Sequence, residues 1–119
     1  DSDARALNAL GYMLTLHSNR FDEAAKLIVK ANELNPNDPA ILDSLGWVQF
    51  KLGKPKEALP LLQKAHAIFP DPEVSAHLGE VLWVLGEKDK ARSLLEAAGK
   101  DGAGNSVLRE TMQRLLNAP

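Results

Sequence analysis

A Leu-Gly pair recurs along this chain at a nearly constant interval. The pairs are Leu10-Gly11, Leu45-Gly46 and Leu78-Gly79, so the intervals are 35 and 33 residues. Each pair is followed at similar distances by a small residue, an aliphatic residue and an alanine: Ala24, Ile28 and Ala31, then Ala58, Leu62 and Ala65, then Ala91, Leu95 and Ala98. A period of about 34 residues indicates stacked units, because one such unit cannot bury its apolar face alone. The sequence therefore predicts three repeats.

Within a repeat, the apolar residues have helical spacing. In the second repeat they form two stripes, made by Leu42, Leu45 and Leu52 and by Leu59, Leu62 and Ala65. Asp38 and Asp71 each precede a proline, as an N-cap precedes the first helical residue, and Gly53 and Gly86 end the first helices. The pattern predicts helices near 3–17, 21–34, 39–52, 55–68, 72–85 and 88–98.

The C-terminal segment is predicted to cap the array. Residues 99–104 contain three glycines and are expected to form a linker, and a helix at about 106–117 begins at Asn105 or Ser106. Its apolar residues should face the protein: Val107, Leu108, Met112, Leu115 and Leu116. Its polar residues should face water: Arg109, Glu110, Gln113 and Arg114. Such a helix covers the apolar end that stacked repeats leave.

Composition argues against several classes of function. The chain has 14 Lys and Arg against 16 Asp and Glu, and its net charge of −2 gives no reason to expect nucleic acid as a partner. It has no cysteine, which excludes disulfides and thiolate chemistry. No apolar run reaches the roughly 20 residues that cross a bilayer. The chain starts Asp1-Ser2-Asp3, without Met or a leader pattern, so we expect it to belong to a longer protein.

The Leu-Gly pair in each first helix, the alanines in each second helix and the junction prolines Pro36 and Pro70 together resemble the tetratricopeptide repeat (TPR). The resemblance covers residues 4 to about 103. It implies an all-α, right-handed α-solenoid of three helical hairpins plus a C-terminal capping helix. We expect one domain, 1–119, with repeats at about 4–38, 39–71 and 72–103 and a cap at about 106–117. The third repeat departs from the family pattern because it lacks the closing proline.

The stretches that begin at Asp38 and Asp71 also resemble the C-terminal repeats of proteobacterial outer-membrane TPR lipoproteins. One such lipoprotein binds and activates a periplasmic carboxyl-terminal processing protease. The resemblance implies a periplasmic protease adaptor, tethered to the outer membrane through a lipidated cysteine upstream of this chain. A cytoplasmic location is the alternative. We expect no membrane insertion by this segment itself, and exposed repeat ends would allow oligomers to form.

The family resemblance also implies that the first helices of the repeats line a concave surface for a partner. The residues beside the core stripes of these helices are Asn8, Tyr12, Asp43, Trp47, Phe50, Lys51, His77, Glu80 and Trp83. We predict that their rings form pockets for a peptide or partner helix, and that the polar residues favour a basic or amide-bearing ligand. Three alternatives stay open. Trp47 and Trp83 could pack between repeats, or upstream repeats of a longer parent could pack onto this groove or onto helix 3–17. The segment could also be the structural end of a longer solenoid that binds elsewhere.

The sequence gives no reason to expect an enzyme, a cofactor or a metal site. The three histidines, His17, His66 and His77, are far apart and form no i, i+4 pair. No strained nucleophile turn surrounds Ser44, which rules against a hydrolase built with Asp43 and His77. The glycines at 99–104 follow a helix and are not followed by Lys-Ser or Lys-Thr, so they do not form a phosphate loop.

One well-known type of TPR ligand is also disfavoured. Some TPR domains hold the C-terminal carboxylate of a chaperone in a clamp of Lys, Asn and Arg side chains. Only Asn8 and Lys51 are of a suitable type here, and Asp43 and Glu80 would repel an acidic tail. The sequence thus predicts a non-catalytic interaction scaffold with a different ligand chemistry.

Overall fold

The computed structural model describes residues 2–117, and all the regular structure in that range is helical. Its helices are α1 (Ser2–His17), α2 (Phe21–Leu34), α3 (Pro39–Lys51), α4 (Pro55–Ile68), α5 (Pro72–Val84), α6 (Lys88–Gly102) and α7 (Ser106–Leu116). The predicted all-α fold is confirmed. The two ends of the expected domain 1–119, at residue 1 and residues 118–119, lie outside the described residues.

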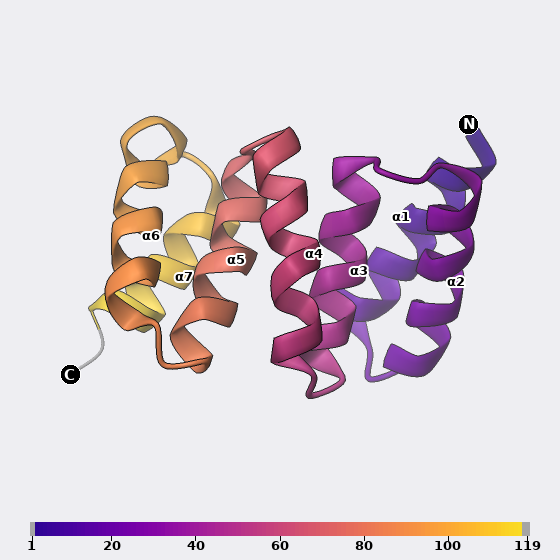
Figure 1. Ribbon diagram of the computed structural model, residues 1–119, viewed down its shortest axis with the longest axis horizontal. Helices are drawn as coiled ribbons and strands as arrows, with labels where there is room; N and C mark the ends of the chain where they lie inside the picture. The colour runs from indigo at the N-terminus through magenta and orange to yellow at the C-terminus, as the bar shows by residue number, and fades with distance from the viewer. Residues whose placement is uncertain (1, 118–119) are drawn as a thin grey trace.

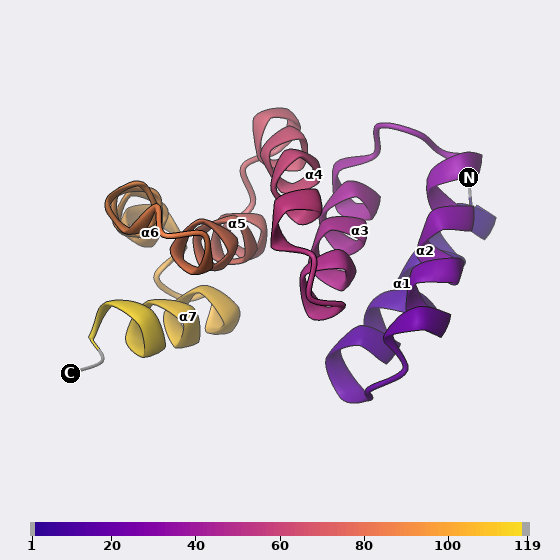
Figure 2. The same ribbon diagram turned by 60° about the horizontal axis from the view of Figure 1, so that its bottom comes forward.

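The helices form three hairpins that stack into an arch. α1 packs with α2, α3 with α4 and α5 with α6, while α7 packs against both α5 and α6. The first helix, α1, and the capping helix, α7, lie toward opposite ends of the long axis (Figure 1). Figure 2 shows α1 and α7 at the two ends of the arch, with α3 and α5 between them and α2, α4 and α6 on the outer side. The first helices of the hairpins therefore line the inner surface.

Local sequence signals set the helix ends. The Asp38 side chain accepts hydrogen bonds from the backbone N–H groups of Ala40 and Ile41, at 2.9 and 3.3 Å, and Pro39 begins α3. Asp71 caps α5 in the same way, with Pro72 as its first residue. These caps satisfy backbone donors that the first helical turn leaves free.

The Leu-Gly pairs are explained by the packing inside each hairpin. A Cβ atom built on Gly46 would lie 2.7 Å from Cγ of Leu62, far closer than two carbon atoms can approach. The same close approach occurs at Gly11 and Gly79. The glycine thus lets the second helix come near enough to bury Leu62 completely, and the fully buried Ala58 and Ala65 on either side keep that helix thin.

The expected linker at 99–104 was wrong for its first four residues, since α6 continues to Gly102. Gly99 and Gly102 are contact residues rather than hinge residues. A Cβ on Gly102 would lie 2.9 Å from the ring of Pro72 and 3.2 Å from Leu108, and one on Gly99 would lie 3.2 Å from Met112. The glycines let α6 run close to α5 and α7.

The capping helix packs as its apolar pattern predicts. Leu108 is buried with Ala76 and Leu95, and the other apolar residues expected to face the protein surround this cluster: Val107, Met112, Leu115 and Leu116. The side chain of Asn105 accepts a hydrogen bond from the N–H of Leu108 at 2.9 Å and so begins α7.

Candidate functional site

The inner surface of the arch carries two cavities, which we call together the groove. The first, of about 340 Å³, lies between the middle of α1 and the first turns of α3 and α5, and we call it the carboxylate pocket. Its lining residues are Asn8, Tyr12, Pro39, Ala40, Asp43, Ser44, Phe69, Asp71, Glu73 and Val74. The second, of about 400 Å³, lies between α1 and α7, and we call it the cap pocket; its lining residues are Tyr12, Thr15, Leu16, Trp47, Lys51, His77, Glu80, Val107, Glu110, Thr111 and Arg114.

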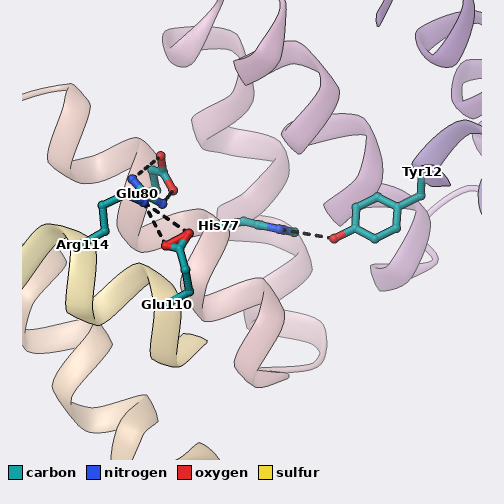
Figure 3. A network of polar contacts seen from close by, with 5 residues as sticks. All are labelled: Tyr12, His77, Glu80, Glu110 and Arg114. Carbon is teal, nitrogen blue, oxygen red and sulfur yellow. Dashed lines mark hydrogen bonds and ion pairs between the residues drawn. The ribbon is translucent and has the colours of Figure 1, made fainter. Parts of the chain in front are cut away.

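Tyr12 stands between the two cavities and lines both. Its hydroxyl donates a hydrogen bond to Oε2 of Glu73 at 2.6 Å and lies 3.4 Å from Nε2 of His77. Figure 3 shows the Tyr12 and His77 side chains pointing toward each other from α1 and α5. Burial and the adjacent Glu73 carboxylate raise the pKa of Tyr12 above its ordinary value. The phenol therefore stays protonated and acts as a donor across the arch.

His77 is held from three sides beneath the groove. Its Nδ1 donates to Oδ1 of Asp43 at 2.9 Å, and both residues are buried, with 2% and 6% of their surfaces exposed. The ring of Trp47 stacks on the His77 imidazole, with ring centroids 4.0 Å apart and planes 16° apart. The Trp47 ring also stacks on the ring of Phe50, with centroids 5.1 Å apart. These contacts join α3 to α5 and make the groove floor rigid.

The structure gathers seven of the nine predicted site residues around the groove. Asn8, Tyr12 and Asp43 line the carboxylate pocket, and the cap pocket is lined by Tyr12, Trp47, Lys51, His77 and Glu80. Phe50 and Trp83 line neither of these cavities and pack beside the core that α4, α5 and α6 share. The binding role of all nine stays a prediction.

Trp47 matches the packing alternative. Only 7% of its surface is exposed, because it lies between the His77 and Phe50 rings. Lys51 sits over its face, with Nζ 5.1 Å from the ring centroid. Trp47 thus lines the cap pocket while its ring contact with His77 joins two repeats, and little of its surface is open to a ligand.

Glu80 was predicted to give a ligand polar direction, but the structure pairs it with Arg114, which is exposed to water as predicted. Arg114 of α7 donates to both carboxylate oxygens of Glu80, at 2.7 and 3.1 Å, and also to Glu110 (Figure 3). These hydrogen bonds raise the pKa of Arg114 above its ordinary value. Because α7 docks on α5, the capping helix neutralises the carboxylate that a basic ligand would otherwise meet there.

Several groove residues were missed from the sequence. Glu73 lies in the first turn of α5, outside the stripe that was followed, and Asp71 was taken only as a helix cap. Thr111 of α7 is buried and lines the cap pocket. The useful signal was the run from Asp71 to Glu73, because it places two carboxylates at the N-terminus of the same helix.

Replacing Tyr12 with Phe tests the link across the arch. The change keeps the ring and removes the hydroxyl that bonds Glu73, so we expect a loss of about 1 kcal/mol in the free energy of unfolding. Amide hydrogen exchange in α1 should become faster, because the Tyr12 hydroxyl bonds α1 to Glu73 at the start of α5. Unchanged exchange in α1 would show that Tyr12 does not hold the arch.

Within residues 2–117, no group of three or more His, Asp or Glu side chains is arranged to hold a metal ion. None of the described helices is both long enough and apolar enough to cross a membrane.

Comparison with known proteins identifies the family of this chain. Tetratricopeptide repeat models match residues 4–38 and 49–115. A TPR repeat-containing protein of Pseudomonas aeruginosa is 47% identical over 116 residues, which are 98% of this chain and 20% of that protein. The chain belongs to the tetratricopeptide repeat family, and it spans about a fifth of the length of that relative.

Solved TPR structures share the fold at low sequence identity. The Sgt2 TPR domain of Aspergillus fumigatus has a TM-score of 0.81 at 16% identity, covering 98% of this chain and 79% of that one. PcrH, in complex with the chaperone binding region of PopB, has a TM-score of 0.77 at 22% sequence identity. That match covers 98% of this chain and 94% of PcrH. The first TPR of Spaghetti (RPAP3), bound to an HSP90 peptide, has a TM-score of 0.81 at 17% sequence identity. That match covers 98% of this chain and 92% of the other chain. These likenesses establish the solenoid fold.

Proposed function

We propose that this domain is a non-catalytic adaptor that binds an extended peptide segment of a partner protein in the groove. The observation that carries the proposal is the pair of adjoining cavities on the inner surface, lined by side chains of α1, α3, α5 and α7. The network of Tyr12, Asp43 and His77 joins these walls through hydrogen bonds within the protein, which lowers the ordering cost of binding. Structures of two proteins with this fold contain a bound peptide or partner region, which supports the same use here.

The test is to select binding peptides from a random library and then block the groove. Ala40 is exposed and lines the carboxylate pocket, so Ala40→Trp fills the cavity without entering the core. Ala67→Trp is the matched control, because Ala67 is exposed on the outer helix α4. We expect Ala40→Trp to weaken peptide binding by roughly tenfold or more, measured by calorimetry, and Ala67→Trp to leave it unchanged. Equal binding by both variants would refute the groove as the binding surface.

The finer part of the proposal concerns the partner. We propose a periplasmic setting, in which the domain serves a carboxyl-terminal processing protease and is tethered to the outer membrane through a segment upstream of residue 1. The support is the resemblance of the second and third repeats to those of envelope TPR lipoproteins. Calorimetry with a purified protease of this class tests it directly. Absence of binding to the protease, with peptide binding retained, would remove this partner and keep the adaptor role.

A structural role is the second candidate, and one observation favours it. The exposed large apolar side chains of the first hairpin, which a neighbouring repeat could cover, include Leu10, Met13, Val29 and Leu34, with 54%, 55%, 43% and 44% of their surfaces exposed. On this proposal the domain ends a longer solenoid, and a partner binds elsewhere. If Met13→Asp abolished partner capture by the full-length protein while Ala40→Trp had no effect, this second role would replace the first.

A further inference from the structure

The carboxylate pocket differs from the rest of the groove in its charge. Three carboxylates line it, Asp43, Asp71 and Glu73, and its lining includes no Lys, Arg or His. The cap pocket, by contrast, contains Lys51 and Arg114 along with its two glutamates. A ligand along the groove therefore meets strong negative potential at only one end.

The hydrogen-bonding capacity of this pocket is unbalanced toward acceptors. Glu73 accepts from Tyr12, Asp71 accepts from the Glu73 N–H, and Asp43 accepts from His77, in each case through one carboxylate oxygen. No described group donates to the second oxygen of any of the three. The hydroxyls of Tyr12 and Ser44 both donate within the protein, the latter to the carbonyl of Ala40 at 3.0 Å. The pocket thus offers open acceptors and little hydroxyl donor capacity to a ligand.

A buried amide oxygen adds to this imbalance independently of the carboxylates. Oδ1 of Asn8, on the α1 wall, is buried and accepts no hydrogen bond. A buried acceptor without a donor is costly, and a turn of the Asn8 amide that presents this oxygen to a donor-rich ligand would reduce the cost.

The remaining walls are apolar and suit an aliphatic stem. Val74 is buried, while Pro39, Ala40 and Phe69 line the opening, and 59% of the Phe69 surface is exposed at the rim. A long basic side chain places its methylene groups against such a surface and its charged head against the acceptors. A guanidinium also stacks on aromatic rings and presents five donors in a fixed fork, so it fits several acceptors better than an ammonium does.

We propose that the carboxylate pocket binds an arginine side chain of the partner segment, an inference that rests on the proposed use of the groove. The arginine fixes the direction of the segment, because only this end of the groove is acidic. A ligand that ends in a carboxylate or carries acidic residues is excluded from the same pocket by Asp71 and Glu73.

The test uses small probes, so that it does not depend on knowing the partner. Nα-acetyl-argininamide is titrated into the labelled domain and followed by amide chemical shifts, with the citrulline analogue as a neutral probe of the same shape. We expect saturable shifts at Ala40, Asp43 and residues 69–74 with the arginine probe and much smaller ones with citrulline. Equal shifts with both probes, or shifts elsewhere, would overturn the inference.

Charge-removing variants sharpen the test. Glu73→Gln keeps an acceptor for Tyr12, and Asp71→Asn keeps a capping oxygen for α5, so both should stay folded. Each should lower the affinity for the arginine probe on the order of tenfold. Glu57→Gln, an equal change of charge on the outer helix α4, should leave that affinity unchanged. Unchanged affinity in both pocket variants would refute the proposal.

The peptide selection separates the two proposals. If peptides bind the groove but show no enrichment of arginine, and Glu73→Gln does not change their affinity, the arginine inference fails while the adaptor function stands. If the arginine probe binds the pocket but no peptide binds the groove, the pocket chemistry stands and the proposed function fails.

Discussion

Replacing His77 with Ala is expected to lower the free energy of unfolding by about 3–5 kcal/mol, the largest single effect in the inner surface. The substitution removes the donor 2.9 Å from the Asp43 carboxylate and leaves that carboxylate buried. It also removes the ring on which Trp47 stacks at 4.0 Å. Urea unfolding followed by circular dichroism measures the change.

The matched control is His17→Ala, because His17 is exposed and should change stability by less than about 0.5 kcal/mol. A double-mutant cycle with Asp43→Ala isolates the contact between the two residues. The double variant should lose clearly less than the sum of the single losses. Additive losses would show that the Asp43–His77 contact does not join the second and third repeats.

Replacing Leu62 with Ala is expected to lower the free energy of unfolding by about 2–5 kcal/mol. The Leu62 side chain is fully buried and fills the space that Gly46 leaves on the facing helix. Its removal therefore opens a cavity where two helices approach most closely. The exposed Leu10 provides the matched control, since Leu10→Ala removes the same atoms from a side chain that is 54% exposed.

The Gly46 contact makes a second, sharper version of this experiment possible. In the natural background Gly46→Ala forces a methyl group to within 2.7 Å of the Leu62 Cγ and should be destabilising by about 1–3 kcal/mol. In the Leu62→Ala background the clash is absent, and the higher helix propensity of alanine should remove most of that loss. An equal loss in both backgrounds would contradict the explanation of the Leu-Gly repeat.

The fold could be predicted from the sequence because local signals and the repeat pattern agree. Asp38 and Asp71 cap the helices that they were expected to begin, and Leu62 occupies the core position that its interval from Gly46 predicts. The error came at Gly99 and Gly102, where glycine was read as a break. A glycine that permits close packing and one that ends a helix look alike in sequence, and only the neighbouring Pro72 and α7 distinguish them.

The site was predicted less completely, because its polar groups are paired across repeats. Asp43 and His77 lie 34 residues apart and bond each other rather than a ligand, and Glu80 is bound by Arg114, also 34 residues away. A helical stripe shows which side chains share a face of one helix, but not which side chains meet between helices. Adding the one-repeat interval as a contact rule would have suggested both pairs.

The central claim is that a partner segment lies in the groove, and site-specific photocrosslinking tests it most directly. A benzophenone amino acid replaces Lys51, which is exposed and lines the cap pocket, or Gln63, which is exposed on the outer helix α4. A selected peptide should crosslink efficiently from position 51 and not from position 63. Crosslinking from position 63, with none from position 51, would contradict the account and place the binding surface on the outer side of the arch.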